Sequence, residues 1–313
     1  MSETSNEAPL VRELRHTSGA NLKLDEPLAP YTSMKIGGPA DYFIEVDHHA
    51  ALADVLRALN RCYIEFCVLG NGSNVLVSDR GVRGAVIRLA GDFKRLEWRE
   101  EDGGVRARVG AAYGVARLVR EAARKGYAGL EFAEGIPGTV GGALFMNAGA
   151  YGSEFEKIVV RVEGLTSVGE PREFLRHKMR FTYRDSHLPS GTVVTRVEMR
   201  LQRSETAGVG AKVRALTERR KNSQPSGFPN SGSMFRNPPG DFAGRLIEAA
   251  GLKGKRIGQC QISERHANFF VNLGGASALE VRRLMELAQA EVRRRFGVEL
   301  AAEVKFLGEW PAE

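Results

Sequence analysis

Long apolar runs are absent from this chain, and so is any cysteine pattern typical of disulfides or of a metal site. No stretch approaches the roughly 20 apolar residues that a membrane-spanning helix needs. The first 21 residues are polar and lack the apolar core of a secretory signal. The three cysteines, Cys62, Cys67 and Cys260, cannot all pair and lack the spacing of zinc ligands. The sequence therefore predicts a cytoplasmic protein with reduced thiols, no membrane span and no metal.

Several common catalytic motifs are also missing. No G-x-x-x-x-G-K-[ST] phosphate loop and no G-x-S-x-G elbow occurs, which disfavours P-loop nucleotide hydrolysis and serine hydrolysis. The histidines, among them His48, His49, His177, His187 and His266, show no ligand spacing with a carboxylate or a cysteine. We interpret them as surface or core histidines.

The charge of the chain is basic but dispersed. The formal net charge is +7, and the two short basic clusters lie at residues 219–221 and 293–295. The second cluster ends a predicted helix, where cations complement the helix dipole. The first precedes a Ser-Gly-Ser loop and is able to face an anionic ligand. Nucleic-acid binding is not predicted, although a basic binding module remains an alternative.

Glycine is abundant instead, and it is concentrated in two loops. Residues 133–152 hold six glycines, of which Gly135, Gly138, Gly141 and Gly142 are expected to take positive φ and to offer bare N–H groups to a phosphate. A second glycine loop, residues 70–74, follows a strand-like run at 64–69. Taken alone, this second loop is equally well explained as a tight turn. Together, the two loops predict one large phosphorylated cofactor.

A Rossmann dinucleotide site is the obvious alternative, but the sequence argues against it. Gly70 and Gly72 begin the G-x-G-x-x-G pattern, and Val75 stands where the third glycine belongs. Residues 75–79 are typical of a strand and a turn, whereas the dinucleotide motif requires a helix there.

Hydrophobic periodicity predicts a mixed α and β chain long enough for two or three compact units. Strands are expected at 41–46, 64–69, 75–77, 85–89, 105–109, 159–165 and 192–201, and helices at 50–62, 114–125, 209–221 and 278–296. The last helix has capping-box spacing between Ser277 and Glu280, and a stripe formed by Val281, Met285, Ala288, Val292 and Phe296. We predict an N-terminal extension at 1–30, two α+β subdomains at 31–90 and 91–203, and a C-terminal domain at 204–313.

Six motifs, in order along residues 31–308, resemble those of one known family. They are Tyr31-Thr-Ser-Met-Lys-Ile-Gly-Gly38, Gly70-Asn-Gly-Ser-Asn-Val-Leu-Val77, Gly135-Ile-Pro-Gly-Thr-Val-Gly-Gly142 with Met146-Asn-Ala-Gly-Ala-Tyr-Gly152, Phe181-Thr-Tyr-Arg-Asp-Ser186, Gly232-Ser-Met-Phe-Arg-Asn-Pro238 and Glu303-Val-Lys-Phe-Leu-Gly308. They are similar to motifs of MurB, the UDP-N-acetylenolpyruvoylglucosamine reductases of peptidoglycan synthesis. The short segment at 183–197 resembles the second type of this family, which lacks a long tyrosine-bearing loop.

This resemblance implies an α+β fold: the FAD-binding fold of the vanillyl-alcohol-oxidase (PCMH) type, followed by a C-terminal α+β substrate domain. It implies that the subdomains at 31–90 and 91–203 bind FAD and that the domain at 204–313 binds substrate. It also implies a set of FAD contacts. These are Gly70, Asn71, Gly72, Ser73, Asn74, Gly135, Ile136, Pro137, Gly138 and Thr139 around the pyrophosphate, and Gly142, Asn147, Gly149 and Ala150 in the following segment, the last three beside the flavin.

The implied reaction has two stages. NADPH reduces FAD, and the reduced flavin then passes hydride to the vinyl carbon of UDP-N-acetylglucosamine enolpyruvate, whose neighbouring carbon is protonated to give UDP-N-acetylmuramate. The resemblance assigns catalysis to Arg184, Ser233 and Glu303, and substrate binding to Tyr183, Lys221 and Asn237. Because an ionised carboxylate would repel a developing enolate, we expect Glu303 to be protonated or otherwise able to donate. A flavin oxidase of a sugar or an alcohol is the alternative within the same fold.

Without the resemblance, these catalytic residues are unremarkable. Ser233 is a turn serine, comparable to Ser226 or Ser231. Glu303 falls on the polar side of a predicted alternating strand that runs from Val298 to Phe306. One position departs from the family pattern, because Arg236 replaces the common lysine and keeps its charge without its shape.

Overall fold

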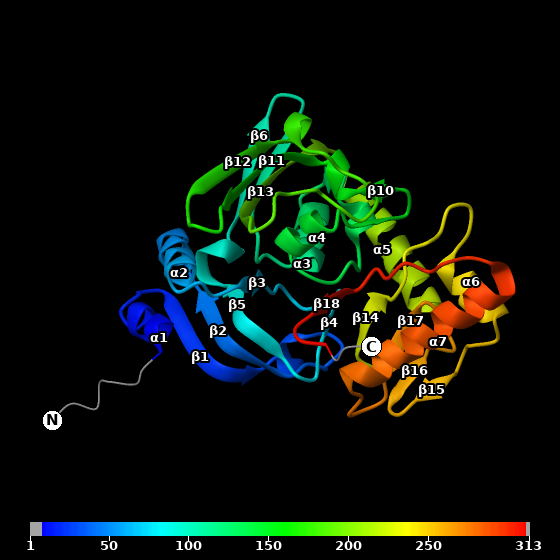
Figure 1. Ribbon diagram of the computed structural model, residues 1–313. Coiled ribbons are helices and arrows are strands. Elements are labelled where there is room, and N and C mark those ends of the chain that lie inside the picture. Colours follow the sequence, from blue (N-terminus) through cyan, green and yellow to red (C-terminus); the bar gives the residue numbers. More distant parts are fainter. Residues whose placement is uncertain (1–7, 311–313) are drawn as a thin grey trace. The chain divides into compact units, whose positions relative to one another are not determined.

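The computed structural model describes residues 8–310, and its ribbon is shown in Figure 1. The chain forms two compact units built from interleaved segments. Unit 1 consists of Met1–Leu24, Tyr42–Gly70 and Gly84–Thr217, and unit 2 of Asp25–Asp41, Asn71–Arg83 and Glu218–Glu313. None of the helices in residues 8–310 combines the length and the apolar character that crossing a membrane requires. The N-terminal part of the expected extension, residues 1–7, lies outside the described residues.

A four-stranded sheet begins unit 1. Its strands run in the order β1 (Ala20–Pro27), β2 (Pro39–Val46), β5 (Val82–Leu89) and β3 (Phe66–Val68). Helix α2 (His49–Arg61) begins at His48, whose Nδ1 accepts a hydrogen bond from the Ala51 N–H at 3.2 Å, and α1 (Pro9–Leu14) contacts α2. Apolar residues of α2 recur at helical spacing and are buried in the unit 1 core, because they form one face of the helix.

A larger antiparallel sheet forms the rest of unit 1. Its order is β12 (Pro171–Leu175), β11 (Val159–Leu165), β13 (Val193–Arg203), β7 (Gly104–Gly110) and β6 (Leu96–Glu101), and β8 (Tyr127–Ala128) pairs with the end of β13. Alternate residues of β7, such as Val105 and Val109, are buried, and the intervening Arg106 and Arg108 are partly exposed. Helices α3 (Val115–Arg124) and α4 (Val140–Phe145) belong to the same core (Figure 1).

Unit 2 combines a small sheet with two helices. The sheet order is β14 (Asn230–Ser233), β17 (Phe269–Asn272), β16 (Cys260–Ile262) and β15 (Arg256–Ile257). Helices α6 (Ala243–Ala249) and α7 (Ala278–Phe296) supply the apolar residues of its core, which also includes Met34, Ile36 and Leu76 from the first quarter of the chain. Strand β4 (Val75–Val77) pairs in parallel with β18 (Lys305–Leu307), and α5 (Thr206–Ser223) contributes residues to both units.

Short elements complete the chain. The remaining strands are β9 (Gly149–Ala150) and β10 (Ser153–Glu154), and the 3-10 helices are η1 (Ala29–Tyr31), η2 (Gly91–Lys94), η3 (Glu131–Ala133), η4 (Phe155–Lys157) and η5 (Arg176–Lys178).

Most of the expected elements are confirmed, and one is wrong. Helix α7 has the predicted bounds and a complete capping box between Ser277 and Glu280. The strand expected from Val298 to Phe306 is restricted to β18, and an isolated bridge joins Ala302 to Phe235. Leu300 and Val304 are both buried although the segment between them is not a strand, and Phe306 is 40% exposed. The alternation of apolar and polar residues in the sequence therefore arose from two buried side chains, Leu300 and Val304, in an irregular segment.

Candidate active site

The glycine loop at residues 135–139 connects η3 to α4. Gly135 and Gly138 have φ values of +72° and +116°, in the left-handed region that was expected. The expectation was wrong for Gly141 and Gly142, which lie inside α4 and have helical geometry. The backbone N–H groups of Gly135 and Gly138 donate no hydrogen bond to any residue between 8 and 310. Two backbone donors of this loop therefore remain able to bind an anion.

Gly70 approaches this loop closely within unit 1. A Cβ atom on Gly70 would lie only 2.7 Å from Oγ1 of Thr139. The same Oγ1 accepts a hydrogen bond from the Gly142 N–H at 3.3 Å and thereby caps α4. Because the Gly142 N–H is used in this way, its expected cofactor contact must come from another atom. The two glycine-rich segments thus meet where Gly70 reaches Thr139, and a larger side chain at position 70 would push them apart.

The glycine loop at residues 70–74 continues into unit 2, to which residues 71–74 belong. Gly72 has a φ of +59°, and a Cβ atom there would lie 2.5 Å from the Tyr31 carbonyl oxygen. The chain then enters β4, as the sequence indicated, and not the helix that a dinucleotide motif requires. The rejection of a Rossmann site is therefore confirmed.

Asn147 braces the segment that is expected beside the flavin. It is fully buried and has a φ of +39°. Its Oδ1 accepts a hydrogen bond from the Glu156 N–H at 3.0 Å, and its Nδ2 donates to the Thr182 carbonyl at 3.1 Å. Because both ends of the side-chain amide are engaged, any cofactor contact of Asn147 is limited to its backbone or to the remaining Nδ2 hydrogen. Gly149 and Ala150 follow in β9, which pairs with β10.

The turn that Asn147 holds carries Tyr183 and Arg184. The Thr182 N–H donates to the Asp185 carbonyl at 2.9 Å, and the Asp185 N–H donates back to the Thr182 carbonyl at 3.1 Å. Arg184 has a φ of +61°, which is uncommon for a residue other than glycine. Its guanidinium lies 4.9 Å from the centroid of the Tyr183 ring, which is 46% exposed. The turn therefore presents a cation and an aromatic ring together.

In unit 2, hydrogen bonds join Glu303 to Asn74 and to the residue that follows Ser233. The Glu303 N–H donates to the carbonyl of Met234, the residue after Ser233, at 2.8 Å. Asn74 Nδ2 donates to the Glu303 carbonyl at 3.1 Å, and the Lys305 N–H donates to the Asn74 carbonyl at 3.0 Å. The fold thus brings Ser233, Glu303 and the end of the glycine loop at 70–74 close together, although Asn74 and Glu303 are 229 positions apart.

Sequence reasoning missed Ser33, which lies between two segments of the predicted site. Its N–H donates to the Gly72 carbonyl at 3.1 Å, and its Oγ donates to the carbonyl of Asn230, the first residue of β14, at 2.7 Å. It therefore links the glycine loop to the strand that ends at Ser233. The motif at residues 31–38 was noticed through its resemblance, but no local pattern indicated this role, because one partner lies 197 positions away.

Comparison with known proteins decides the family. A family model described as the C-terminal domain of UDP-N-acetylenolpyruvoylglucosamine reductase matches residues 224–307, and one described as an FAD binding domain matches residues 40–174. The chain is 43% identical to UDP-N-acetylenolpyruvoylglucosamine reductase 2 of Symbiobacterium thermophilum, over 97% of this chain and 98% of that protein. It is 40% identical to the reductase of Bacillus velezensis, over 96% of this chain and 98% of that protein.

The solved structure of MurB from Thermus caldophilus is also similar, at 38% identity and a TM-score of 0.78, covering 92% of this chain and 98% of that one. This chain belongs to the UDP-N-acetylenolpyruvoylglucosamine reductase family. It is an FAD-dependent oxidoreductase that uses FAD and NADPH, and the expected α+β fold, an FAD-binding fold of the vanillyl-alcohol-oxidase type followed by a C-terminal α+β substrate domain, is confirmed.

Two positions that are predicted to bind substrate already have protein partners here. Asn237 Oδ1 accepts a hydrogen bond from the Ala243 N–H, the first residue of α6, at 3.1 Å. Lys221 lies near the end of α5, where its Nζ is 3.0 Å from Glu218. Asn237 therefore keeps its Nδ2 donor for a ligand, and Lys221 must leave an exposed ion pair to reach one.

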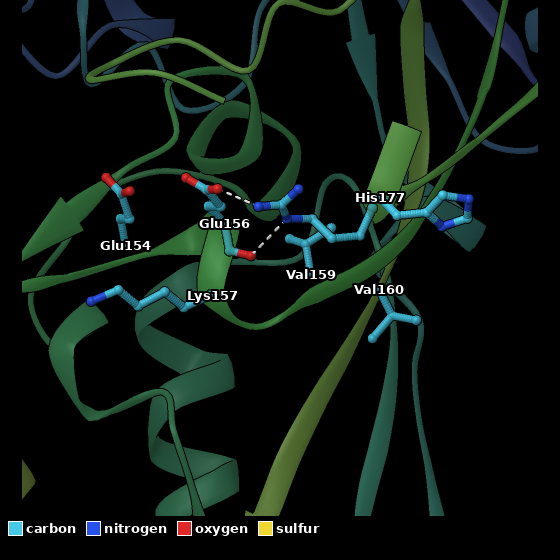
Figure 2. Close-up of a pocket in the computed structure, with 7 residues that line it drawn as sticks. Glu154, Glu156, Lys157, Val159, Val160 and His177 are labelled. Atoms are coloured by element: carbon cyan, nitrogen blue, oxygen red, sulfur yellow. Dashed lines mark hydrogen bonds and ion pairs between the residues drawn. The ribbon is translucent and has the colours of Figure 1, made fainter. Parts of the chain in front are cut away.

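An open pocket of unit 1 lies outside the predicted reductase site. Figure 2 shows its lining, which consists of Glu154, Glu156, Lys157, Val159, Val160, Arg176 and His177. Arg176 donates to both the carboxylate and the backbone carbonyl of Glu156, so the main charges of the pocket neutralise each other. None of the predicted catalytic residues lines this pocket.

Two of the three thiols, those of Cys67 and Cys260, lack reactive character. Burial raises the pKa of Cys67 to about 11. Burial, with a smaller contribution from the charge of Glu280, raises the pKa of Cys260 to about 12. Both thiols are therefore protonated at neutral pH and lack the thiolate character that nucleophilic chemistry needs.

Proposed function

We propose that this chain reduces UDP-N-acetylglucosamine enolpyruvate to UDP-N-acetylmuramate with electrons from NADPH, during peptidoglycan precursor synthesis in the cytoplasm. Through this step it would support cell wall biogenesis, cell shape and cell division. The observation that carries the proposal is that, in a chain from this reductase family, hydrogen bonds hold Glu303 against Asn74 and against Met234, the residue after Ser233, within unit 2. These backbone contacts bring the residue with a carboxyl group and the residue with a hydroxyl group close to a predicted cofactor loop, and a reduction completed by a proton needs side chains of these types.

The glycine loops fit the phosphates of FAD. The N–H groups of Gly135 and Gly138 have no acceptor among residues 8–310, so they can donate to an anion. Gly70 lies close to Thr139 and has no side chain that would block the anion. Residues 70–74 and 135–139 would hold the pyrophosphate, and residues 147–150 would lie beside the ring system. Bound FAD supplies the two-electron chemistry, accepting electrons from NADPH and passing hydride to the vinyl carbon of the substrate.

Arg184 would bind the carboxylate of the enolpyruvyl group. A guanidinium forms paired hydrogen bonds with a carboxylate and stays charged while negative charge grows on it. The contact with the neighbouring Tyr183 ring would restrict the direction of this side chain before substrate arrives. Such preorganisation reduces the rearrangement needed during the reaction.

Ser233 would donate the proton that completes the reduction. A hydroxyl is a weak acid, but an enolate carbon is basic enough to accept its proton when the donor is held in place. The position of β14 is fixed by the bond from Ser33 to Asn230 at one end and by the bond between Glu303 and Met234 at the other. Glu303 would stabilise the enol by donating a hydrogen bond, since an ionised carboxylate would repel it.

An anaerobic absorbance experiment tests this function. The FAD-loaded protein is recorded alone, after one equivalent of NADPH, and after UDP-N-acetylglucosamine enolpyruvate. We expect the visible absorbance band of the oxidised flavin to bleach with NADPH and to return with the enolpyruvyl sugar. Bleaching without recovery, together with rapid reoxidation by oxygen, would instead indicate a flavin oxidase. Protein that does not bind FAD would contradict the cofactor assignment as well.

A further inference from the structure

Arg236 follows Ser233 by three residues, and its side chain has no hydrogen-bond or ion-pair partner among residues 8–310. Its backbone N–H donates to the Ala301 carbonyl at 2.9 Å, which fixes the residue beside the segment that carries Glu303. The side chain is partly buried, and its Nε is shielded from solvent without an acceptor. A cationic group has therefore lost part of its hydration and has gained no protein partner in return.

Two other arginines of unit 2 have carboxylate partners. Arg282 is buried to a similar degree, with an 18% exposed side chain, and its Nε donates to Glu286 at 2.8 Å. Arg245 is more exposed and is nevertheless paired with Asp241. Buried polar groups in folded proteins are normally hydrogen-bonded, so an unpartnered one indicates a ligand or another function.

We propose that Arg236 binds the diphosphate of the UDP sugar. This inference rests on the proposed function, since the substrate must carry that group. The planar guanidinium presents paired N–H donors that match two phosphate oxygens, and the attraction is larger for a partly dehydrated cation than for one in bulk water. Asn237 follows directly and offers its Nδ2, because its Oδ1 is occupied by α6. The enolpyruvyl carboxylate is already assigned to Arg184.

Binding of UDP-N-acetylglucosamine tests the proposal, because this probe contains the diphosphate and lacks the enolpyruvyl carboxylate. Its affinity for the oxidised holoenzyme is measured by calorimetry for the parent, Arg236→Gln, Arg236→Lys and the control Arg282→Gln. A charged hydrogen bond contributes about 1.5–3 kcal/mol, so Arg236→Gln should weaken binding about 10- to 100-fold. Arg236→Lys should lose less, because charge remains without the fork. Arg282→Gln should bind like the parent.

The NADPH half-reaction distinguishes the possible sources of phosphate. In anaerobic stopped-flow measurements, the rate of flavin reduction by NADPH should be unchanged in Arg236→Gln. A loss confined to this half-reaction would show that Arg236 binds NADPH, and it would overturn the proposal. Unchanged affinity for UDP-N-acetylglucosamine with a raised KM for the enolpyruvyl sugar would also overturn it, because the contact would then be to the carboxylate.

The FAD content and the thermal midpoint of each variant are measured to check that it is folded. If Arg236→Gln does not fold, Arg236→Lys alone decides: a weaker affinity for UDP-N-acetylglucosamine at parental FAD content supports the proposal, and parental affinity contradicts it. Failure of the parent to reoxidise with the enolpyruvyl sugar would contradict the proposed function itself. If the parent is functional and Arg236→Gln binds UDP-N-acetylglucosamine with the parental affinity, only the role of Arg236 is contradicted.

Discussion

Ser233 is the residue whose loss should separate the two half-reactions. It belongs to β14 in unit 2, whereas the unpaired N–H donors of Gly135 and Gly138 belong to a loop of unit 1. Removing its hydroxyl by Ser233→Ala should leave flavin reduction by NADPH intact. Reoxidation by the enolpyruvyl sugar should fall by at least about 100-fold, the usual contribution of a positioned proton donor. Rapid-mixing absorbance measurements of each half-reaction provide both rates.

The matched control for this prediction is Ser226→Ala. Ser226 is an exposed serine close by in the sequence, and sequence spacing alone ranks it equally with Ser233. It should keep both rates. Near-parental reoxidation in Ser233→Ala would assign the proton to another group, and a fall in both half-reactions would indicate a structural defect.

At the scale of single residues, motif resemblance proposes which residues form the site, whereas the contacts around those residues could not be predicted. Motif resemblance selected Ser233 and Glu303, whereas spacing alone did not distinguish them from other polar residues. Asn147 was expected only as a cofactor contact, and its role as a brace for the turn at 182–185 depends on backbone groups far along the chain. Such partners are brought together by tertiary folding, so no local pattern encodes them. Individual FAD and substrate contacts remain predictions.

At the scale of elements, Ser33 connects the glycine loop to β14. Ser33→Ala removes the hydrogen bond to Asn230 and should cost about 1 kcal/mol of stability. Because the lost bond positions the strand that carries Ser233, reoxidation by the enolpyruvyl sugar should fall more than flavin reduction by NADPH. Ser33→Thr keeps the hydroxyl and should restore most of the difference. The measurement is the ratio of the two half-reaction rates, at matched FAD content.

Equal loss in both half-reactions would count against a positioning role for Ser33. A merely structural defect lowers the folded fraction and therefore changes the amplitudes of both reactions together, leaving the ratio of their rates unchanged. The ratio is thus the deciding quantity.

The large sheet of unit 1 carries an ion-pair network on its partly exposed face. Glu163 of β11 lies 2.9 Å from Arg108, 3.1 Å from Arg196 and 3.4 Å from Arg161. Partial burial raises the pKa of Glu163, but the hydrogen bond from Arg108 and the charges of these three arginines outweigh it, so the pKa lies below its usual value. Cross-strand pairs of this kind stabilise the order of neighbouring strands.

Glu163→Gln should therefore destabilise the protein by about 1–2 kcal/mol at neutral pH, since it leaves three arginines without their shared partner. A carboxyl group with a lowered folded-state pKa stabilises the fold above its unfolded pKa of about 4.3, and this contribution is lost as the pH falls through the folded-state pKa. The thermal midpoints of parent and variant should consequently converge in acid. Glu65→Gln, an exposed substitution in the same unit, is the control. A pH-independent difference would contradict the electrostatic explanation.

Local signals determined which elements could be predicted. Helix α7 combines an apolar stripe, a capping box and Gly297 at its C-terminal end with a φ of +69°, and its bounds were predicted correctly. Residues 298–304 carry no such signals. The apolar residues Leu300 and Val304 produced an alternating pattern typical of a strand, because both are buried. The Leu300 carbonyl, however, accepts a hydrogen bond from the side chain of Gln289 in α7. Non-local contacts thus replaced regular pairing in that segment.

At the scale of the whole molecule, the two units are interleaved along the chain, which periodicity did not indicate. Residues 25–41 and 71–83 belong to unit 2 although they precede most of unit 1. Element patterns report local structure, whereas membership of a unit depends on which apolar faces meet after folding. The subdomain boundaries at residues 90 and 203 remain a prediction.

This interleaving should make the C-terminal part of the chain unable to fold by itself. A fragment of residues 218–313 lacks β4, the parallel partner of β18, and it lacks Met34 and Leu76 of the unit 2 core. It also lacks Asp79, whose carboxylate accepts hydrogen bonds from the Ala278 and Leu279 N–H groups at 2.7 and 3.0 Å, at the first turn of α7. We expect circular dichroism to show no cooperative unfolding transition in this fragment.

In the full chain, the same reasoning makes Asp79 a stabilising residue of α7. Asp79→Ala should lower the free energy of unfolding by about 0.5–2 kcal/mol, the usual cost of losing a side chain that caps a helix. Asp102→Ala, which is in a turn of unit 1, serves as the control because it leaves the α7 terminus unchanged. Unchanged stability in Asp79→Ala would contradict this capping role, whereas a cooperative transition in the isolated fragment would mean that residues 218–313 form a self-sufficient core. The contacts with residues 25–41 and 71–83 would then be secondary to the stability of unit 2.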